Sequence, residues 1–580
     1  MLHRTRAIGI LVLLACGFTV ISFNLIQIQL VDHDKYWRMA VDNYLHPETI
    51  PPKRGAIFDS EGSILAQTEM KTDLYVDGKL LVNPNQQLPA LAQILQISAA
   101  QLAAGFDPRN RHALLAKNID DSTVTQLREL KWNSLIFSPH DLRVYPNNGM
   151  GAQVLGFTGQ DGHGLIGVEK EMDDLLSGVP GERWVERDGK KNVIAGYQTR
   201  ERAAVDGDNV TLTVNMAIQH VVEEQLDQIV QTYQPNGAYI IVMDPHTGEI
   251  LAMGSRPTFN PNDNSTHTPD RVLNRCITDM VEPGSIFKII TLAGALSEGV
   301  INLDTPVFCE NGSFNYAGKL LRDDEPHGTL PVLEVMAQSS NIGFAKLALN
   351  YLGEEKLYHY ATAFGIGQRT GLFQQQGESS GLLRPVNKWS ALSITRIPMG
   401  QEVGATPIQM VTAMSVIANG GRLVQPRLVK EARDDEGRVV KIYPPRTVRQ
   451  VISPSVAAEV ARALHQVTID GTAKNIQITD PSGARYSYAG KTGTAQKFVD
   501  GEYSHTKFVS SFIGFMPAED PAFVALVMVD EPHTTKYYGA EVSAPVFANI
   551  AGQVAQILNL PPDIPAPTAP ALSANTTSAL

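Results

Sequence analysis

Three short motifs in the second half of the chain carry residue types suited to acyl transfer through a serine. The first is Ser285-Ile-Phe-Lys288, which follows Pro283-Gly284 and precedes the apolar run 289–296. Pro-Gly-Ser before an apolar run predicts a helix start, so Lys288, three residues on, shares a face with Ser285. A serine hydroxyl is a weak nucleophile until a base takes its proton, and a lysine becomes that base once burial lowers its pKa.

The other two motifs supply groups that handle protons, amides and carboxylates. Ser339–Asn341 opens an apolar segment that predicts a helix, and it offers a hydroxyl to relay a proton and an amide to bind a peptide group. Lys491–Thr494 reads Lys-Thr-Gly-Thr, for which we expect an edge strand that directs Lys491 and the hydroxyls of Thr492 and Thr494 at a carboxylate. Gly493 lets the backbone approach, so that the Thr494 N–H can point at an oxyanion.

The order of the motifs is more specific than any one of them. A second Ser-x-x-Lys occurs at Ser504, and further Ser-x-Asn copies begin at Ser22, Ser313 and Ser573, whereas Lys-Thr-Gly occurs once. The three motifs are separated by 54 and 152 residues, counted from their first residues, and the Ser504 copy fails because it follows the Lys-Thr-Gly. In this order they resemble the signature of penicillin-recognising serine enzymes.

The elements around the motifs predict an α/β domain. Helical spacing covers 218–233, and strand patterns cover 238–243 and 249–253, with a tight turn between them. Strand patterns return at 508–515 and 522–529. Strands at both ends of this stretch with helices between them predict one sheet that joins the two ends.

Composition limits the classes of protein. The chain has 580 residues, with 48 Lys+Arg against 60 Asp+Glu and a net charge of −12, which argues against a nucleic-acid partner. Its length predicts about three or four domains. Three cysteines exclude a disulfide framework, and we expect Cys276 and Cys309 to be separate buried thiols, with one bridge between them as the alternative.

The N-terminus predicts a membrane anchor. Residues 7–26 carry no charge and are enough to cross a bilayer as a helix, while Arg4 and Arg6 precede them. A cleaved signal peptide, or a lipoprotein cut before Cys16, is less favoured because apolar residues continue beyond it. We therefore expect the bulk of the chain outside the cytoplasm, a compartment that disfavours ATP-dependent chemistry.

The chain resembles the class B penicillin-binding proteins from the anchor to about Leu558. A box at Arg54–Asp59 is similar to the one that opens their pedestal domain, although Ser60-Glu-Gly62 departs from the usual Arg-x-Gly. Further motifs similar to pedestal and transpeptidase landmarks are Arg143–Pro146, Gly164–Glu169, Asn274-Arg275, Thr406–Gln409 and Tyr537–Gly539.

The resemblance implies a domain order. A cytoplasmic stub and single transmembrane helix would occupy 1–30, and an elongated, mainly β pedestal (the dimerisation-type domain of class B) 31–204. The α/β transpeptidase domain, with a central antiparallel sheet flanked by helices and an all-helical subdomain, would occupy 205–560, and a disordered tail 561–580.

The resemblance also implies a D,D-transpeptidase that cross-links peptidoglycan stem peptides and is acylated by β-lactams. Ser285 would be the nucleophile, Lys288 its general base and Ser339 a proton relay to the leaving amine. Asn341 would hold the donor amide, and Lys491–Thr494 would bind the terminal carboxylate. The N–H groups of Ser285 and Thr494 would form the oxyanion hole. No metal and no cofactor would be required.

Subclass and partners follow from the same resemblance. Glu282-Pro-Gly-Ser285 resembles the division-specific (FtsI-type) enzymes of the septum, whereas elongation-specific ones more often carry Pro-Pro-Gly-Ser. The implied partners are lipid-linked nascent glycan, a SEDS-family glycosyltransferase and other divisome membrane proteins, at a bacterial inner membrane with the bulk of the chain periplasmic. Alternatives are an elongation enzyme, a D,D-carboxypeptidase, a β-lactamase, a β-lactam sensor and a non-enzymatic divisome scaffold. A class A enzyme is excluded because no room remains for a glycosyltransferase domain.

Overall fold

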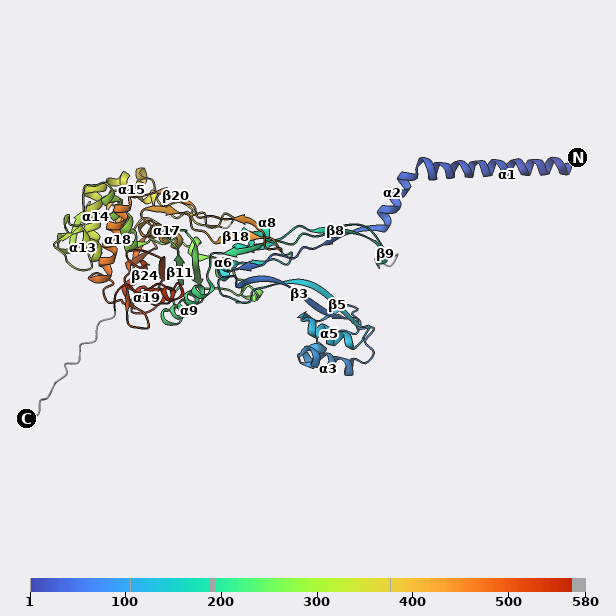
Figure 1. The fold of residues 1–580 in the computed structure, drawn as a ribbon, viewed down its shortest axis with the longest axis horizontal. Coiled ribbons are helices and arrows are strands. Elements are labelled where there is room, and N and C mark those ends of the chain that lie inside the picture. Colours follow the sequence, from blue (N-terminus) through green and yellow to red (C-terminus); the bar gives the residue numbers. More distant parts are fainter. Residues whose placement is uncertain (1, 105, 188–192, 376, 566–580) are drawn as a thin grey trace, which may run out of the picture. The chain divides into compact units, whose positions relative to one another are not determined.

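The computed structural model describes residues 2–104, 106–187, 193–375 and 377–565 (Figure 1). Contacts within the chain define two compact units, one of residues 1–54 with 177–207 and one of residues 55–176 with 208–580. This division does not test the domain boundaries at 30, 204 and 560, which stay predictions. Most of the expected disordered tail, residues 566–580, lies outside the described residues.

The first unit contains a long apolar helix and a small sheet. Helix α1 (Leu2–Ile26) continues into a π-helical turn, η1 (Gln27–Val31), and α2 (His33–Tyr44) follows. Residues 3–31 are long and apolar enough to cross a membrane, and the described chain buries none of their most apolar stretch. Their side chains therefore find no protein core, which supports a membrane anchor. The sheet is antiparallel, in the order β1 (Leu45–Ile50), β8 (Gly181–Arg187), β9 (Val193–Arg202).

The second unit begins with a mainly β region. Its seven-stranded sheet has the order β19-β18-β10-β2-β3-β4, with β5 also paired to β3. A separate small hydrophobic core, which includes Leu74, Leu91 and Leu127, lies at the β3 part of this sheet. The strands are β2 (Ile57–Phe58), β3 (Ile64–Val76), β4 (Ala113–Ile119), β5 (Leu135–Val144), β10 (Asn209–Leu212), β18 (Val429–Arg433) and β19 (Val439–Ile442). The other elements here are α3 (Pro84–Leu95), α4 (Ala99–Ala104), α5 (Asp121–Glu129), α6 (Ala152–Leu155), β6 (Phe157–Thr158), β7 (Gly164–Ile166), α7 (Gly167–Glu171) and α8 (Asp173–Leu176).

A five-stranded antiparallel sheet forms the centre of the second unit, in the order β12-β11-β25-β24-β23. All seven residues of β11 are buried, and so are seven of the eight in β25, so both faces of the central strands are covered. The predicted strands, the helix at 218–233 and the edge position of Lys491–Thr494 are confirmed. The strands are β11 (Gly237–Met243), β12 (Ile250–Arg256), β23 (Ala489–Val499), β24 (Glu502–Met516) and β25 (Phe523–Asp530).

Helices cover this sheet and form an all-helical part beside it (Figure 1). Helices α9 (Met216–Tyr233) and α19 (Gly539–Ile557) pack against each other and the sheet, and α17 (Pro407–Ala418) and α18 (Pro454–Ile469) do the same. The other helices are η2 (Asn264–Thr266), α10 (Pro269–Val272), α11 (Arg275–Thr278), η3 (Gly284–Phe287), α12 (Lys288–Ser297), η4 (Glu310–Gly312), α13 (Val332–Ala337), α14 (Asn341–Leu347), η5 (Ala348–Leu352), α15 (Gly353–Ala363), η6 (Val386–Lys388), α16 (Ser393–Arg396) and η7 (Ile397–Met399). The short strands are β13 (Pro306–Phe308), β14 (Ser313–Tyr316), β15 (Lys319–Arg322), β16 (Thr329–Pro331), β17 (Arg422–Val424), β20 (Thr447–Gln450), β21 (Ile478–Thr479) and β22 (Arg485–Tyr486). Cys276 and Cys309 are buried and unbridged, as expected.

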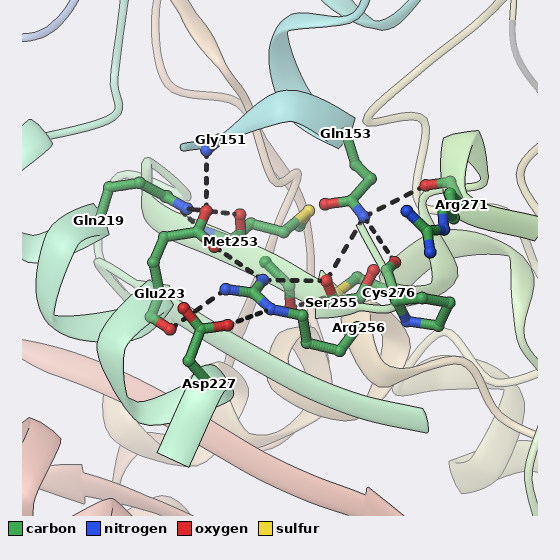
Figure 2. Close-up of polar contacts among 12 residues, drawn as sticks. Gly151, Gln153, Gln219, Glu223, Asp227, Met253, Ser255, Arg256, Arg271 and Cys276 are labelled. Carbon is green, nitrogen blue, oxygen red and sulfur yellow. Dashed lines mark hydrogen bonds and ion pairs between the residues drawn. The ribbon is translucent and has the colours of Figure 1, made fainter. Parts of the chain in front are cut away.

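A buried polar network joins the start of α6 to α9 and β12 (Figure 2). The Arg256 guanidinium donates to Glu223 and to Asp227, each at 2.7 Å. The other Glu223 oxygen accepts from the backbone N–H of Gly151 and from the Gln219 side chain, each at 2.8 Å. Because both oxygens of the Glu223 carboxylate accept hydrogen bonds, Glu223 holds the loop at Gly151 against α9.

Candidate active site

A tight turn presents Ser285 at the start of α12. Gly284 has φ of +57°, and its N–H donates to the Gly400 carbonyl at 3.1 Å. Gly400 lies so close that a Cβ there would be 2.2 Å from the Gly284 oxygen. Ser285 then lies in η3, half-buried, and Lys288 is fully buried where η3 passes into α12. The predicted helix start is confirmed, with a 3₁₀ turn at its beginning.

The Ser339–Asn341 motif lies in the loop between α13 and α14. Ser339 has φ of +58°, in the left-handed region that non-glycine residues seldom adopt. Ser340 caps α14 by accepting from the Gly343 N–H at 2.9 Å, and its own hydroxyl donates to Asp323 at 2.6 Å. The cap and the Asp323 carboxylate hold the loop, so that Ser339 is turned away from the helix.

Hydrogen bonds connect these residues to the nucleophile turn. Lys288 Nζ donates to the Ser339 carbonyl at 2.6 Å, to Ser339 Oγ at 3.1 Å and to Asn341 Oδ1 at 2.8 Å. Ser339 Oγ is in turn 3.2 Å from Ser285 Oγ. The structure therefore brings Ser285, Lys288, Ser339 and Asn341 together, although they come from segments 54 residues apart in the sequence.

The electrostatics of Lys288 suit a base. Burial lowers its pKa to about 7, while the negative charges of Asp323 and Asp324 oppose that shift. Its three oxygen partners belong to an amide, a hydroxyl and a backbone carbonyl, so no carboxylate of the described residues bonds directly to the amine. At neutral pH a large fraction of the amine is unprotonated and can accept a proton.

Strand β23 brings the Lys-Thr-Gly motif to the same place. Burial lowers the pKa of Lys491 well below its usual range, and the nearby Lys288 charge lowers it further. A Cβ at Gly493 would lie 3.1 Å from Ile286 Cγ2, so a side chain there would press on the nucleophile turn. A carboxylate placed beside Lys491 would favour its charged form and so raise this pKa.

The threonines of this motif have hydrogen-bond partners outside it. Thr492 Oγ1 lies 2.8 Å from Thr472 Oγ1, and Thr494 Oγ1 accepts from the Gly539 N–H at 3.0 Å. Thr472 follows α18 and its own N–H donates to the Ala337 carbonyl at the end of α13. One loop therefore contacts both the strand and the Ser339 segment.

A pocket of about 970 Å³ adjoins this constellation. Its lining includes Glu282, three residues before the nucleophile, and Ala495, one residue after Thr494. Burial raises the pKa of Glu282, whose Oε1 accepts from the Glu402 N–H at 2.8 Å and the Tyr503 hydroxyl at 3.2 Å. The pocket has room for a ligand of drug size.

Sequence reasoning did not identify Asp323, Asp324 or Thr472. The acidic pair lies in the loop after β15, and its one sequence signal is the run Asp-Asp-Glu at 323–325. Thr472 has no signal beyond its place in an Asp-Gly-Thr turn after a helical segment. The second Ser-x-x-Lys copy lies elsewhere, in β24, where Ser504 Oγ accepts from the backbone N–H groups of Thr506 and Lys507 and lies 3.4 Å from the Thr506 hydroxyl.

Comparisons with known proteins agree with this geometry. The family model described as "Penicillin binding protein transpeptidase domain" matches residues 238–552, and the one described as "Penicillin-binding Protein dimerisation domain" matches residues 49–212. Stage V sporulation protein D of Bacillus subtilis is 34% identical over 558 residues, which cover 94% of this chain and 85% of that protein.

Two further relatives support the same family. Peptidoglycan D,D-transpeptidase FtsI of Escherichia coli is 30% identical over 527 residues, covering 90% of this chain and 86% of that one. The crystal structure of penicillin binding protein 3 from Mycobacterium tuberculosis, complexed with ampicillin, has a TM-score of 0.69 at 27% identity and covers 90% of this chain and 99% of that one. The chain belongs to the class B penicillin-binding proteins, and its second half is a penicillin-binding transpeptidase domain.

Proposed function

We propose that this protein cross-links peptidoglycan through a serine acyl-enzyme. The observation that carries the proposal is the buried Lys288, whose pKa is lowered to about 7 and whose Nζ reaches Ser285 Oγ through Ser339 Oγ. A buried amine without a carboxylate partner destabilises the fold, and such strongly perturbed groups cluster at sites where they have a chemical task. The position next to a half-buried serine supplies that task.

The proposed reaction has two halves. Ser285 Oγ attacks the penultimate D-Ala carbonyl of a D-Ala-D-Ala stem peptide while its proton moves to Lys288. The C–N bond to the last D-Ala then breaks, and that amine leaves with a proton relayed through Ser339. The amine of a second stem peptide attacks the ester, a new amide forms, and Ser285 recovers its proton.

The remaining residues bind and polarise the donor in this proposal. Asn341 holds the donor amide, and its own amide N–H already donates to the Arg322 carbonyl at 3.2 Å. Lys491, Thr492 and Thr494 bind the terminal carboxylate where β23 passes the nucleophile turn, with Gly493 allowing the close approach. The backbone N–H groups of Ser285 and Thr494 form the oxyanion hole.

The cellular assignment rests on the family. We propose a septal role, with the anchor in the inner membrane, the catalytic domain in the periplasm, and a SEDS-family glycosyltransferase and other divisome proteins as partners. Nascent lipid-linked glycan supplies the glycan strands whose stem peptides are cross-linked. The relatives include a sporulation protein as well as FtsI, so the elongation role remains the second candidate. Depletion of this protein distinguishes the two roles: filamentous cells would support division, and round cells would support elongation.

Intact mass after incubation with penicillin tests the chemistry directly. The full chain in detergent should gain one stable adduct, and Ser285→Ala should gain none. Ser504→Ala is the matched control, because it removes the serine of the unused Ser-x-x-Lys copy, and it should acylate like the unaltered protein. An adduct that vanishes with hydrolysed drug accumulating would indicate a β-lactamase, and no adduct would support the scaffold alternative.

Product analysis separates the transferase from a carboxypeptidase. With a D-Ala-D-Ala stem peptide alone, both release D-Ala. With an added peptide amine, a transpeptidase forms a dimer in proportion to the amine, whereas a carboxypeptidase forms only the shortened peptide. Lack of a dimer at saturating amine, with D-Ala still released, would overturn the transfer step.

A further inference from the structure

A second pocket, of about 220 Å³, lies between α17 and the β17–β20 pair. We call it the arginine pocket, because Arg369, Arg446 and Arg449 line it and no Asp or Glu does. No residue of the three catalytic motifs lines it. Figure 1 shows α15, α17 and β20 together in this part of the second unit.

The three guanidinium groups have no anionic partner among the residues that the structure describes. Arg449 Nη2 donates to Gln368 Oε1 at 3.1 Å, and Arg446 Nη1 donates to Gln425 Oε1 at 3.4 Å. Arg449 Nε is buried and donates to nothing in the described part of the chain. Arg369 and Arg446 are exposed and Arg449 is half-buried. By contrast, Arg143, Arg256, Arg275 and Arg427, whose side chains are largely buried, each contact a carboxylate.

The carboxylate that approaches this region is already engaged. Glu378 is buried and accepts from the Thr370 N–H and hydroxyl, each at 2.6 Å, and from the Gly371 N–H at 3.0 Å. It thus holds the loop that carries Arg369 and is not a lining residue of the pocket. On the other side, the Gln409 amide of α17 donates to the Gln368 carbonyl at 2.7 Å.

These contacts give the arginine pocket a fixed wall. Gln409 ties the loop to α17, the Gln425 amide donates to the Gly371 carbonyl at 3.0 Å, and β17 pairs with β20. The donors that remain are guanidinium N–H groups, whose planar fork matches the two oxygens of a carboxylate or phosphate. Uncompensated positive charge on three neighbouring side chains favours an anion at this place.

We propose that the arginine pocket binds an oxyanion group, carboxylate or phosphate, at a site separate from the catalytic serine. Its volume admits one such group with the few atoms that carry it, and not a whole stem peptide. Two sources present this chemistry to an extracytoplasmic domain: the carboxylates of a peptidoglycan stem peptide, and phosphate, free or on a lipid-linked precursor. The proposal does not depend on the proposed transpeptidation.

Calorimetric titration of the full chain in detergent tests the site. Penicillin is added first so that Ser285 is blocked, and inorganic phosphate is titrated at constant ionic strength. We expect saturable binding that weakens at least about tenfold in the double variant R446Q/R449Q, since one lost charge-assisted hydrogen bond is worth about that factor. The matched control R433Q/R438Q removes the same charge from the exposed β18–β19 hairpin and should bind phosphate like the unaltered chain.

Two additions keep the result decisive. If thermal unfolding shows that R446Q/R449Q is unstable, the variant R446K/R449K replaces it. This variant retains the charge and loses the planar guanidinium fork, so it should bind phosphate with an affinity between those of the unaltered chain and the glutamine variant. A soluble muramyl pentapeptide with free carboxylates identifies the source: competition with phosphate assigns stem-peptide carboxylates, and binding of phosphate alone assigns phosphate. Absence of phosphate binding, or equal binding by the glutamine variant, overturns the site.

Discussion

The pKa of Lys288 makes the rate of acylation by penicillin depend on pH in a particular way. The perturbation is pH alone, between 5 and 9, on the unaltered chain. Burial lowers the pKa of this amine to about 7. Only the unprotonated amine can take the Ser285 proton, so the second-order acylation rate should follow its unprotonated fraction.

The expected magnitude follows from that pKa. With a pKa of about 7, roughly one tenth of the amines are unprotonated at pH 6 and roughly nine tenths at pH 8. The rate should therefore rise about tenfold between these two values and level off above pH 8. A lysine of ordinary pKa would instead give a rise of about a hundredfold over the same interval with no plateau.

These rates are measured by stopping the reaction with penicillin at successive times and determining the acylated fraction by intact mass. Ser285→Ala gives the background at each pH. The charge of Lys288 lowers the pKa of Lys491, so the two amines interact and the measured midpoint belongs to the pair of lysines. Asp324→Asn removes a negative charge that raises the pKa of both, and the midpoint should move to lower pH. A rate that rises without a plateau to pH 9, or that ignores pH down to 5, would refute the assignment of Lys288 as the base.

Three substitutions test the geometry around the site. Gly400→Ala places a Cβ 2.2 Å from the Gly284 carbonyl oxygen and should slow penicillin acylation about a hundredfold, because the nucleophile turn must shift; Gly437→Ala, also at positive φ but with nothing within 4 Å, should leave the rate unchanged. Arg256→Ala leaves the buried Glu223 carboxylate without its ion-pair partner and should lower the free energy of unfolding by about 3–5 kcal/mol, so an unshifted midpoint in thermal unfolding would contradict it. Thr472→Val removes the partner of the Lys-Thr-Gly hydroxyl and should raise KM for a stem peptide about tenfold with kcat retained, and Thr472→Ser should restore it.

The sequence pattern was enough to predict much of the fold and to select the candidate site. Alternation and turn residues located β11 and β12, and the order of three motifs selected Ser285, Lys288 and Lys491 as the candidate site residues. The strands and turns could be predicted because each depends on residues within about ten positions, where period and turn chemistry carry information. The motif order instead uses spacings of 54 and 152 residues. The edge position of β23 was expected because it lets the motif direct its side chains at a ligand carboxylate.

Pairing across long separations could not be predicted. Strand β10 pairs in parallel with β2, so that Val210 lies beside Ile57, and β18 joins from the other edge of β10. One sheet thus contains strands from both sides of residue 204. Nothing in the local pattern of a short strand specifies a partner 150 residues away, because register and partner are set by packing of the whole sheet.

The residues that tune the site were missed for a related reason. Asp323 acts by bonding Ser340 and the Ile342 N–H, and Thr472 acts by bonding Thr492. Both are polar residues in loops, and loops full of Asp, Gly and Thr occur throughout the chain. Their importance comes from a contact with a residue about 20 positions away, which the sequence of either loop alone does not contain.

The choice of oxygen partners around Lys288 explains how the site can hold two buried lysines at once. A carboxylate in direct contact would favour the protonated amine and raise its pKa, which would remove the base at neutral pH. Ser339 and Asn341 accept hydrogen bonds from Lys288 without carrying a negative charge. The Asp323 carboxylate instead accepts from the Ser340 hydroxyl and the Ile342 N–H. The nearest acids therefore act on the lysines only at a distance, strongly enough to oppose the effect of burial and too weakly to cancel it.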